Sequence, residues 1–273
     1  MEAYFHSPGA PLSEHIEQIW WVRFTAPEYH LERVLPRGKM QLIFNLDDAD
    51  LRVYDPTDIT RVSRFRGPLI SGVHDGYMVI DTAEQAHIMG VVFRPGGVPP
   101  ILGCAAPEFR NVHVPLDDAL GAPAMDLQMA LWEADSPRRC FLLMEQALRR
   151  WLRPPPRTSV TANGALALMV REPGLRATGS LAEHCGISQR HLIRCFHDTV
   201  GVTPKQYARL LRFHHSLELL RHLPPLDLDQ VALVCGYYDQ AHFNRDFRDL
   251  AGITPGHYRR WSRPDIFHLP LLD

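Results

Sequence analysis

The sequence predicts an α+β protein of two domains: a β-rich N-terminal domain closed by helices, and an all-α C-terminal domain. Three observations lead to this prediction. The chain has 273 residues, enough for two domains of about 100–160 residues each. Three consecutive prolines, Pro154-Pro155-Pro156, interrupt it and cannot continue a helix. Strand-length apolar runs precede them, and helical periodicity with an internal repeat follows. We therefore expect domains over residues 1–156 and 157–273.

The composition narrows the class of protein. With 45% hydrophobic and 22% charged residues, the chain is typical of a globular protein. No apolar run reaches the roughly 18 residues of a membrane helix, and the first residues show no signal-peptide pattern. Five cysteines without a Cys-x-x-Cys pair make a disulfide framework or a zinc site unexpected. We expect a cytoplasmic protein that does not associate with membranes.

The net charge of −2 averages two unlike halves. Residues 1–157 carry 16 Lys and Arg against 20 Asp and Glu, a net charge of −4. Residues 158–273 carry 13 against 11, a net charge of +2. This modest positive charge permits a nucleic-acid partner for the second half but does not by itself predict one.

Short apolar runs separated by turns predict the strands of the first domain. These runs are Gln41–Leu46, Leu51–Tyr54, Tyr77–Ile80 and Ile88–Phe93. After about residue 122 the pattern becomes helical. Ser136-Pro137 is typical of a helix start, and Phe141, Met144 and Leu148 follow at helical spacing. We expect two helices to close the β-rich domain.

The second domain contains a duplicated unit. Residues 181–186 align with 231–236 at an offset of 50, and one inserted residue then makes the offset 51. Further matched pairs are Leu192/Phe243, Arg194/Arg245, Phe196/Phe247, Gly201/Gly252, Thr203/Thr254, Pro204/Pro255 and Tyr207/Tyr258. Each copy predicts a helix, a turn at Gly186 or Gly236, and a second helix capped by Ser188 or Asp239. We expect helix-turn-helix copies at about 178–200 and 227–250.

A long helix is predicted between the two copies, from Pro204 to about His222. Nineteen residues at a rise of ~1.5 Å span about 28 Å. Successive major-groove faces on one side of B-DNA lie ~34 Å apart. One connecting helix could therefore present both second helices to successive segments of the major groove.

The repeated unit carries a family resemblance. Residues 236–247, Gly-Tyr-Tyr-Asp-Gln-Ala-His-Phe-Asn-Arg-Asp-Phe, and the following Gly252-Ile253-Thr254-Pro255 resemble the signature of the AraC/XylS family of bacterial transcription regulators. The first copy matches through residues 201–207, and the resemblance covers about 160–261. Ser216 and Tyr237 depart mildly from the usual Ala and Phe. The resemblance implies a double helix-turn-helix that binds double-stranded DNA, acts with RNA polymerase, and activates or represses transcription.

The second helix of each copy carries the candidate DNA contacts. Arginine can bind guanine in a bidentate manner, Gln suits adenine, and Ala or Ile can meet a thymine methyl. Matched to the family pattern, the base-contacting residues are Arg190, Ile193, Arg194, Gln240, Ala241, His242 and Arg245. The candidate phosphate contacts are Gln189, Lys205, Arg209, Arg212, Asn244, Arg248, Arg259 and Arg260. The alternative for any one of them is a solvated or packing side chain.

The resemblance implies that the first domain senses a small-molecule effector or forms a homodimer, often as a cupin-like β-barrel followed by helices. Residues 35–38, 44–46, 93–97 and 114–117 resemble a sensor domain that occurs on some AraC-type regulators. Arg94, beside Gly96 and Gly97, could hold an anionic effector, because a guanidinium and backbone N–H groups converge there. The alternative is a strand-end turn with a surface arginine.

Nothing in the sequence predicts catalysis. No Gly-x-Ser-x-Gly elbow or phosphate-binding loop is present, and His74, His87 and His113 are isolated along the chain. We therefore expect neither an enzyme nor a bound metal or cofactor. Two alternatives stay open: an effector-binding or enzymatic cupin-like protein for which DNA binding is incidental, and a pure interaction protein. A methyl-accepting repair regulator would need more cysteines in the first domain than Cys104 and Cys140.

Overall fold

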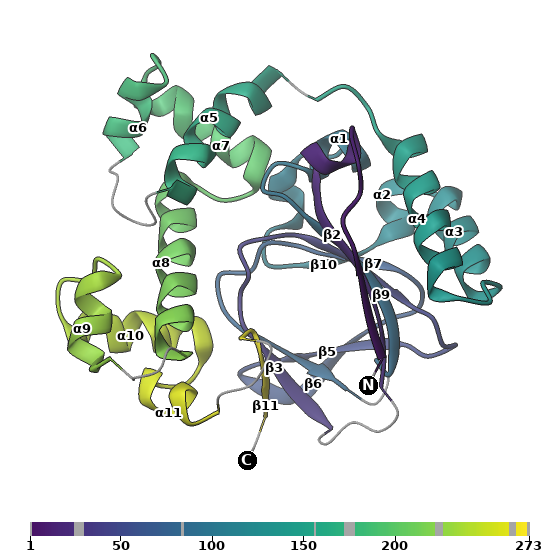
Figure 1. Cartoon of the computed structure of the whole chain (residues 1–273), viewed down its shortest axis with the longest axis horizontal. Coiled ribbons are helices and arrows are strands. Elements are labelled where there is room, and N and C mark those ends of the chain that lie inside the picture. Colours follow the sequence, from purple (N-terminus) through teal and green to yellow (C-terminus); the bar gives the residue numbers. More distant parts are fainter. Residues whose placement is uncertain are drawn as a thin grey trace.

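The computed structural model describes residues 2–24, 30–82, 85–155, 157–171, 178–221, 226–261 and 266–271, without the side chains of residues 157–160. A β-rich N-terminal region and a helical C-terminal region lie side by side (Figure 1). The predicted α+β class is confirmed. Pro156, the last of the three consecutive prolines, and His222, at the predicted end of the long helix, lie outside the described residues.

Two antiparallel sheets form the β-rich region. The first has the order β1-β2-β9-β4-β7-β10 and the second β11-β3-β8-β5-β6. Their strands are β1 (Glu2–His6), β2 (Ile16–Arg23), β3 (Leu31–Val34), β4 (Gln41–Asn45), β5 (Leu51–Asp55), β6 (Asp58–Phe65), β7 (Leu69–Ser71), β8 (Met78–Asp81), β9 (His87–Phe93), β10 (His113–Pro115) and β11 (His268–Pro270). The four predicted strands are confirmed as β4, β5, β8 and β9. The cupin-like description stays a prediction.

Helices close one side of the β-rich region, as the sequence predicts. They are α1 (Val98–Leu102), the 3-10 turn η2 (Ala106–Phe109), α2 (Leu116–Leu120), α3 (Ala122–Trp132) and α4 (Pro137–Trp151); a further 3-10 turn, η1 (Leu12–Glu14), precedes β2. The Ser136 hydroxyl accepts a hydrogen bond from Arg139 N and caps α4. The side chains of Gln128 and Trp132 donate to the carbonyl of Asn45, at 2.8 and 3.1 Å. These bonds fix α3 to the end of β4.

The helical region contains the two predicted helix-turn-helix units. Its helices are α5 (Arg157–Arg171), α6 (Thr178–His184), α7 (Gln189–Val200), α8 (Pro204–Arg221), α9 (Leu228–Val234), α10 (Gln240–Ala251) and α11 (Pro255–Arg260). Helices α6 and α7 form the first unit and α9 and α10 the second, with α8 between them (Figure 1). The turns contain Gly186 and Gly236, both at positive φ.

The chain returns to the first half of the molecule at its C-terminal end. Strand β11 pairs antiparallel with β3, so that His268 lies opposite Val34 and Pro270 opposite Glu32. The ring of His268 lies 2.9 Å from the carboxylate of Glu32. The sequence predicts no strand here. The last described residues therefore join a sheet that the first 81 residues otherwise build.

The long helix α8 packs against the β-rich region near its middle. The Nε2 atom of His214 lies 2.8 Å from the carbonyl oxygen of Pro36, and the ring of Phe267 meets the His214 ring edge-on at 5.2 Å between centroids. Burial lowers the pKa of His214 from 6.5 to about 4, and the charges of Lys39 and Arg37 act in the same direction, whereas the bond to Pro36 opposes it. His214 is therefore neutral at pH 7.

We expect His214 to make folding sensitive to acid. Because its pKa is about 4 in the folded chain and 6.5 in the unfolded chain, the unfolded chain binds more protons between these values. Its contribution to stability is complete above pH 6.5 and is lost as the pH falls toward 4. At ~1.4 kcal/mol per pKa unit, the loss is about 3 kcal/mol. Urea unfolding at pH 7 and pH 4.5 measures it.

The variant His214→Phe provides the comparison for this pH dependence. It keeps an aromatic ring beside Phe267 and removes the titratable group, so it should lose less stability between pH 7 and 4.5 than the natural chain does. His74 and His113 titrate in both proteins and cancel in the difference. An equal loss in the two proteins would show that His214 does not cause the acid sensitivity.

Candidate DNA-binding surface

We call α7 and α10, the second helices of the two units, the recognition helices. Helix α7, the first of them, buries one face and exposes the other. Ser188 caps it by accepting a hydrogen bond from His191 N, and Leu192 and Phe196 are fully buried. This spacing turns Arg190 and Arg194 to the exposed side, with Ile193 half-buried beside them. Its surface thus offers two guanidinium groups and one apolar side chain.

The second recognition helix, α10, repeats this arrangement. The carboxylate of Asp239 accepts a hydrogen bond from His242 N at 2.6 Å, and Phe243 and Phe247 are fully buried. The side chains of Gln240, Ala241 and Arg245 are exposed, and His242 and Asn244 are half-buried. All seven predicted base-contacting residues therefore lie on the solvent side of a capped helix or at its margin.

The predicted phosphate-contacting residues fall into two groups, apart from Asn244, which is half-buried on α10. Gln189, Lys205, Arg248 and Arg260 are exposed. The other group already has partners within the protein: Arg209 pairs with Asp246 and Asp249, Arg212 lies over the ring of Tyr237 at 5.5 Å, and Arg259 donates to the carbonyl of Leu226 at 2.6 Å. The side chains of the exposed group are open to solvent, and a phosphate contact stays a prediction for all eight residues.

The pair between Arg209 and Asp246 is a structural contact that the sequence analysis missed. Asp246 is only 8% exposed and lies on the buried face of α10. A nearly buried carboxylate requires a cationic partner, and Arg209 on α8 supplies it. The repeat carries a signal, because the matching residue in the first copy is Cys195, which needs no such partner.

The Arg94 turn lies at the seam between the two regions. Arg94 Nε donates to the carbonyl of Ser13 at 2.9 Å, and the N–H of Gly97 donates to the carbonyl of Arg94 at 2.8 Å. Arg94 and Gly96 line a cavity of about 10 Å³ with Lys39 and Thr199, which is room for about one water molecule. An effector at Arg94 would have to separate this turn from the end of α7.

The histidines that look isolated in the sequence are not all isolated in the fold. The rings of His74 and His113 lie 4.7 Å apart, and their Nε2 atoms lie 3.5 and 3.3 Å from the hydroxyl of Ser71. The two residues are far apart along the chain but adjacent in the fold, since β10 pairs with β7. Burial lowers the pKa of His74 to about 4 and that of His113 to about 3. Within the described ranges, no group of three or more His, Cys, Asp or Glu residues could hold a metal ion.

Two helix-turn-helix units on one connecting helix, each with an exposed polar surface on its second helix, define a double helix-turn-helix DNA-binding domain. Comparison with known protein families agrees. Residues 181–260 match a family model described as a helix-turn-helix domain, and residues 4–115 match one described as a domain of unknown function (DUF6597). No helix of the described part of the chain is long and apolar enough to cross a membrane.

Curated relatives match about a third of this chain. The HTH-type transcriptional regulator GlxA of Rhizobium meliloti is 35% identical over 83 residues, which are 30% of this chain and 25% of that protein. The HTH-type transcriptional activator RhaR of Salmonella schwarzengrund is 33% identical over 98 residues, 36% of this chain and 34% of that protein. The matches thus span about a quarter to a third of these relatives.

Solved structures of similar sequence or fold include an AraC-type regulator from Chromobacterium violaceum, with 27% identity, a TM-score of 0.37, and coverage of 40% of this chain and 97% of that one. An apo form of a ToxT variant from Vibrio cholerae has 9% identity, a TM-score of 0.47, and coverage of 89% and 97%. The helical region therefore carries an AraC-type helix-turn-helix domain at residues 181–260.

We expect Lys205 to contribute to DNA affinity without reading sequence. Its ammonium group is exposed in the first turn of α8. If it neutralises one phosphate, Lys205→Ala should reduce the slope of log K against log salt by about 0.9 and weaken specific and random DNA alike. Binding titrations at several salt concentrations measure both effects. An unchanged slope, or a loss confined to the preferred site, would contradict a phosphate contact.

Proposed function

We propose that this chain is a transcription regulator that binds specific double-stranded DNA and reads two successive major-groove segments, one with α7 and one with α10. One observation carries the proposal: matched capped helices, on either side of α8, expose side chains that can read bases. Their buried faces hold Leu192 and Phe196 in one copy and Phe243 and Phe247 in the other. The two reading surfaces are therefore held in the same way.

We further propose that the β-rich region responds to a small-molecule effector, with Arg94, Gly96 and Gly97 as the candidate site for an anionic group. Contact between Gly96 and Thr199, near the end of α7, supports this role, because any molecule that opens the seam would act on a recognition helix. We also propose that the chain forms a homodimer, acts with RNA polymerase, is located in the cytoplasm and has no enzymatic activity.

A mobility-shift assay with DNA from the region upstream of its own gene tests the proposal. The full chain should form a complex that survives an excess of random competitor DNA. The same assay with small carboxylates and phosphates tests the effector. If no specific complex forms under any of these conditions, a protein whose β-rich region works without DNA becomes the better interpretation.

A further inference from the structure

The β-rich region contacts the C-terminal end of both recognition helices. Helix α7 is followed by Gly201 and α10 by Gly252, which are equivalent in the repeat and have φ values of +90° and +68°. A Cβ atom on Gly201 would lie 2.9 Å from the carbonyl oxygen of Ala106 and 3.0 Å from Met40 Cε. On Gly252 it would lie 2.3 Å from Cε1 of Tyr77. Each glycine thus lets the end of its helix pack directly on the β-rich region.

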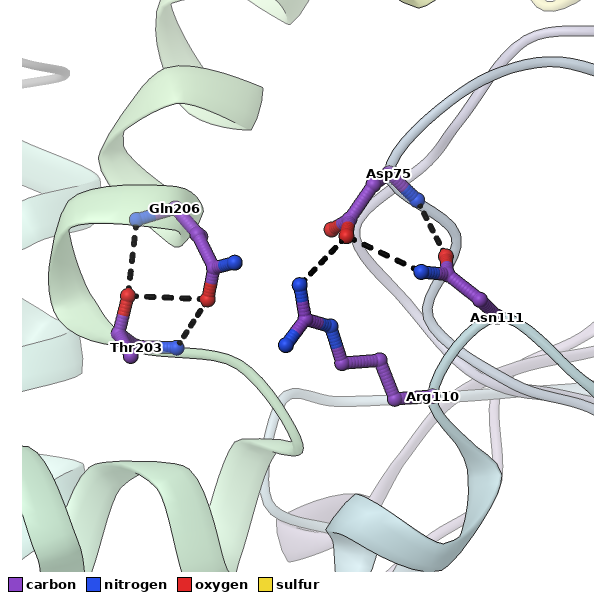
Figure 2. Close-up of polar contacts among 5 residues, drawn as sticks. All are labelled: Asp75, Arg110, Asn111, Thr203 and Gln206. Carbon is purple, nitrogen blue, oxygen red and sulfur yellow. Dashed lines mark hydrogen bonds and ion pairs between the residues drawn. The ribbon is translucent and has the colours of Figure 1, made fainter.

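The two contact points on the β-rich region are tied to each other. Asp75 lies two residues before Tyr77, and its carboxylate accepts hydrogen bonds from Arg110 Nη2 at 2.7 Å and Asn111 Nδ2 at 3.1 Å (Figure 2). Asn111 in turn accepts a bond from Asp75 N at 2.8 Å. Arg110 and Asn111 directly follow η2, which begins at Ala106. We call residues 72–77 and 105–111 together the brace.

The helical side of these contacts is equally constrained. Directly after Gly201, Thr203 N donates to Gln206 Oε1 at 2.9 Å and Gln206 N donates to the Thr203 hydroxyl at 3.3 Å, a capping box that begins α8 (Figure 2). The pair between Arg209 and Asp246 fixes α8 to α10. A displacement of the brace would therefore reach both recognition helices.

The contacts at Gly201 and Gly252 leave the predicted base-contacting surfaces of α7 and α10 exposed to solvent. They lie at the C-terminal ends of α7 and α10, whereas the predicted base-contacting residues lie in the N-terminal halves. Arg190, Arg194 and Arg245 are exposed to solvent with the brace in place. The contact between the brace and the helical region is thus compatible with DNA binding, and it constrains where α7 and α10 can lie.

We propose that the brace sets the separation of α7 and α10, and thereby the spacing between the two DNA segments that the chain accepts, with Tyr77 as a positioning residue. This inference rests on the proposed function, because it requires both helices to read DNA. It assigns the β-rich region a part in DNA specificity in addition to effector binding. Removing the Tyr77 ring frees the end of α10 and should relax the spacing requirement.

The test compares the full chain with Tyr77→Ala on two DNA sites, the preferred site and the same site with one base pair inserted between its two segments. The insertion should weaken binding by the natural chain about tenfold or more, and binding by Tyr77→Ala about threefold or less. Tyr77→Phe keeps the ring on Gly252 and under the Arg33 guanidinium, and it loses the hydroxyl with its bond to the carbonyl of Pro56, so it should behave as the natural chain does. Arg110→Gln, which loosens the brace, should reduce the ratio of the affinities for the two sites, as Tyr77→Ala does.

Tyr54→Ala is the matched control. Tyr54 lies on β5, which pairs with β8, the strand directly after Tyr77, and its hydroxyl donates to Asp81 within the β-rich region. This variant should keep the natural ratio between the two sites. A natural ratio in Tyr77→Ala, or equal changes in Tyr77→Ala and Tyr54→Ala, would overturn the role of the brace while DNA binding stands. A natural chain that accepts both spacings equally overturns it as well. A chain that binds no site specifically overturns the proposed function and the brace with it.

Discussion

Alanine in place of both Arg194 and Arg245 is expected to lower affinity for the preferred DNA site by roughly 10²- to 10⁴-fold. The two arginines are equivalent in the repeat, exposed, and one turn or more from the cap of their helix. A bidentate contact between arginine and guanine is worth about 1–3 kcal/mol, and ~1.4 kcal/mol is tenfold in affinity. Random DNA should lose far less, since only the phosphate attraction of two charges is removed.

Competition titrations with specific and random DNA measure this difference, and Arg150→Ala is the control. Arg150 is an exposed arginine in the last turn of α4, in the β-rich region, so Arg150→Ala removes one such charge away from the recognition helices. The affinity of the Arg150→Ala variant for the preferred site should stay within about twofold of that of the natural chain. Equal losses on specific and random DNA in the double variant would reduce Arg194 and Arg245 to phosphate contacts.

Phe247→Ala is expected to cost about 3–5 kcal/mol of the free energy of unfolding. Phe247 is fully buried, and its ring centroid lies 5.1 Å from that of Phe213, 5.7 Å from that of Phe243 and 5.7 Å from that of Tyr258. It therefore joins α8, α10 and α11. A typical domain is stable by only 5–15 kcal/mol, so this variant should lose most of its stability, and specific DNA binding should fail on warming.

Tyr238→Ala is the control for this prediction. Tyr238 is an aromatic residue in the same helix-turn-helix unit but is 92% exposed, so its removal should change the free energy of unfolding by about 0.5 kcal/mol or less. Urea denaturation followed by circular dichroism compares the two variants. Similar losses in both would mean that Phe247 does not hold the second unit together.

Most of what could be predicted about the fold from the sequence came from the internal repeat. Caps and turns are local features, so Ser188, Asp239, Gly186 and Gly236 could be assigned from spacing alone, and all four occupy the expected places. Strand β11 could not be predicted. It has three residues, one of them a proline, and it pairs with β3 more than 230 residues earlier. No local pattern records such a contact.

In the candidate site, too, the locally determined features could be predicted and the long-range contacts could not. The exposed positions on α7 and α10 follow from helical spacing, because Leu192 and Phe243 fix which side is buried. The partners of Arg209 and the approach of His74 to His113 depend on how separate elements pack, which spacing does not encode. The contacts of Gly201 and Gly252 with the β-rich region likewise required the fold, because the repeat shows only that the two glycines are equivalent.

The central claim is that α7 and α10 read two successive segments of one major-groove face. Hydroxyl-radical and methylation footprinting of the full chain on its preferred site tests this claim most directly. We predict two protected segments on the same side of the DNA, with centres about 10–10.5 base pairs apart, and loss of the guanine contacts of one segment in Arg194→Ala and of the other in Arg245→Ala. A single protected segment, or loss of both segments with either variant, would contradict it.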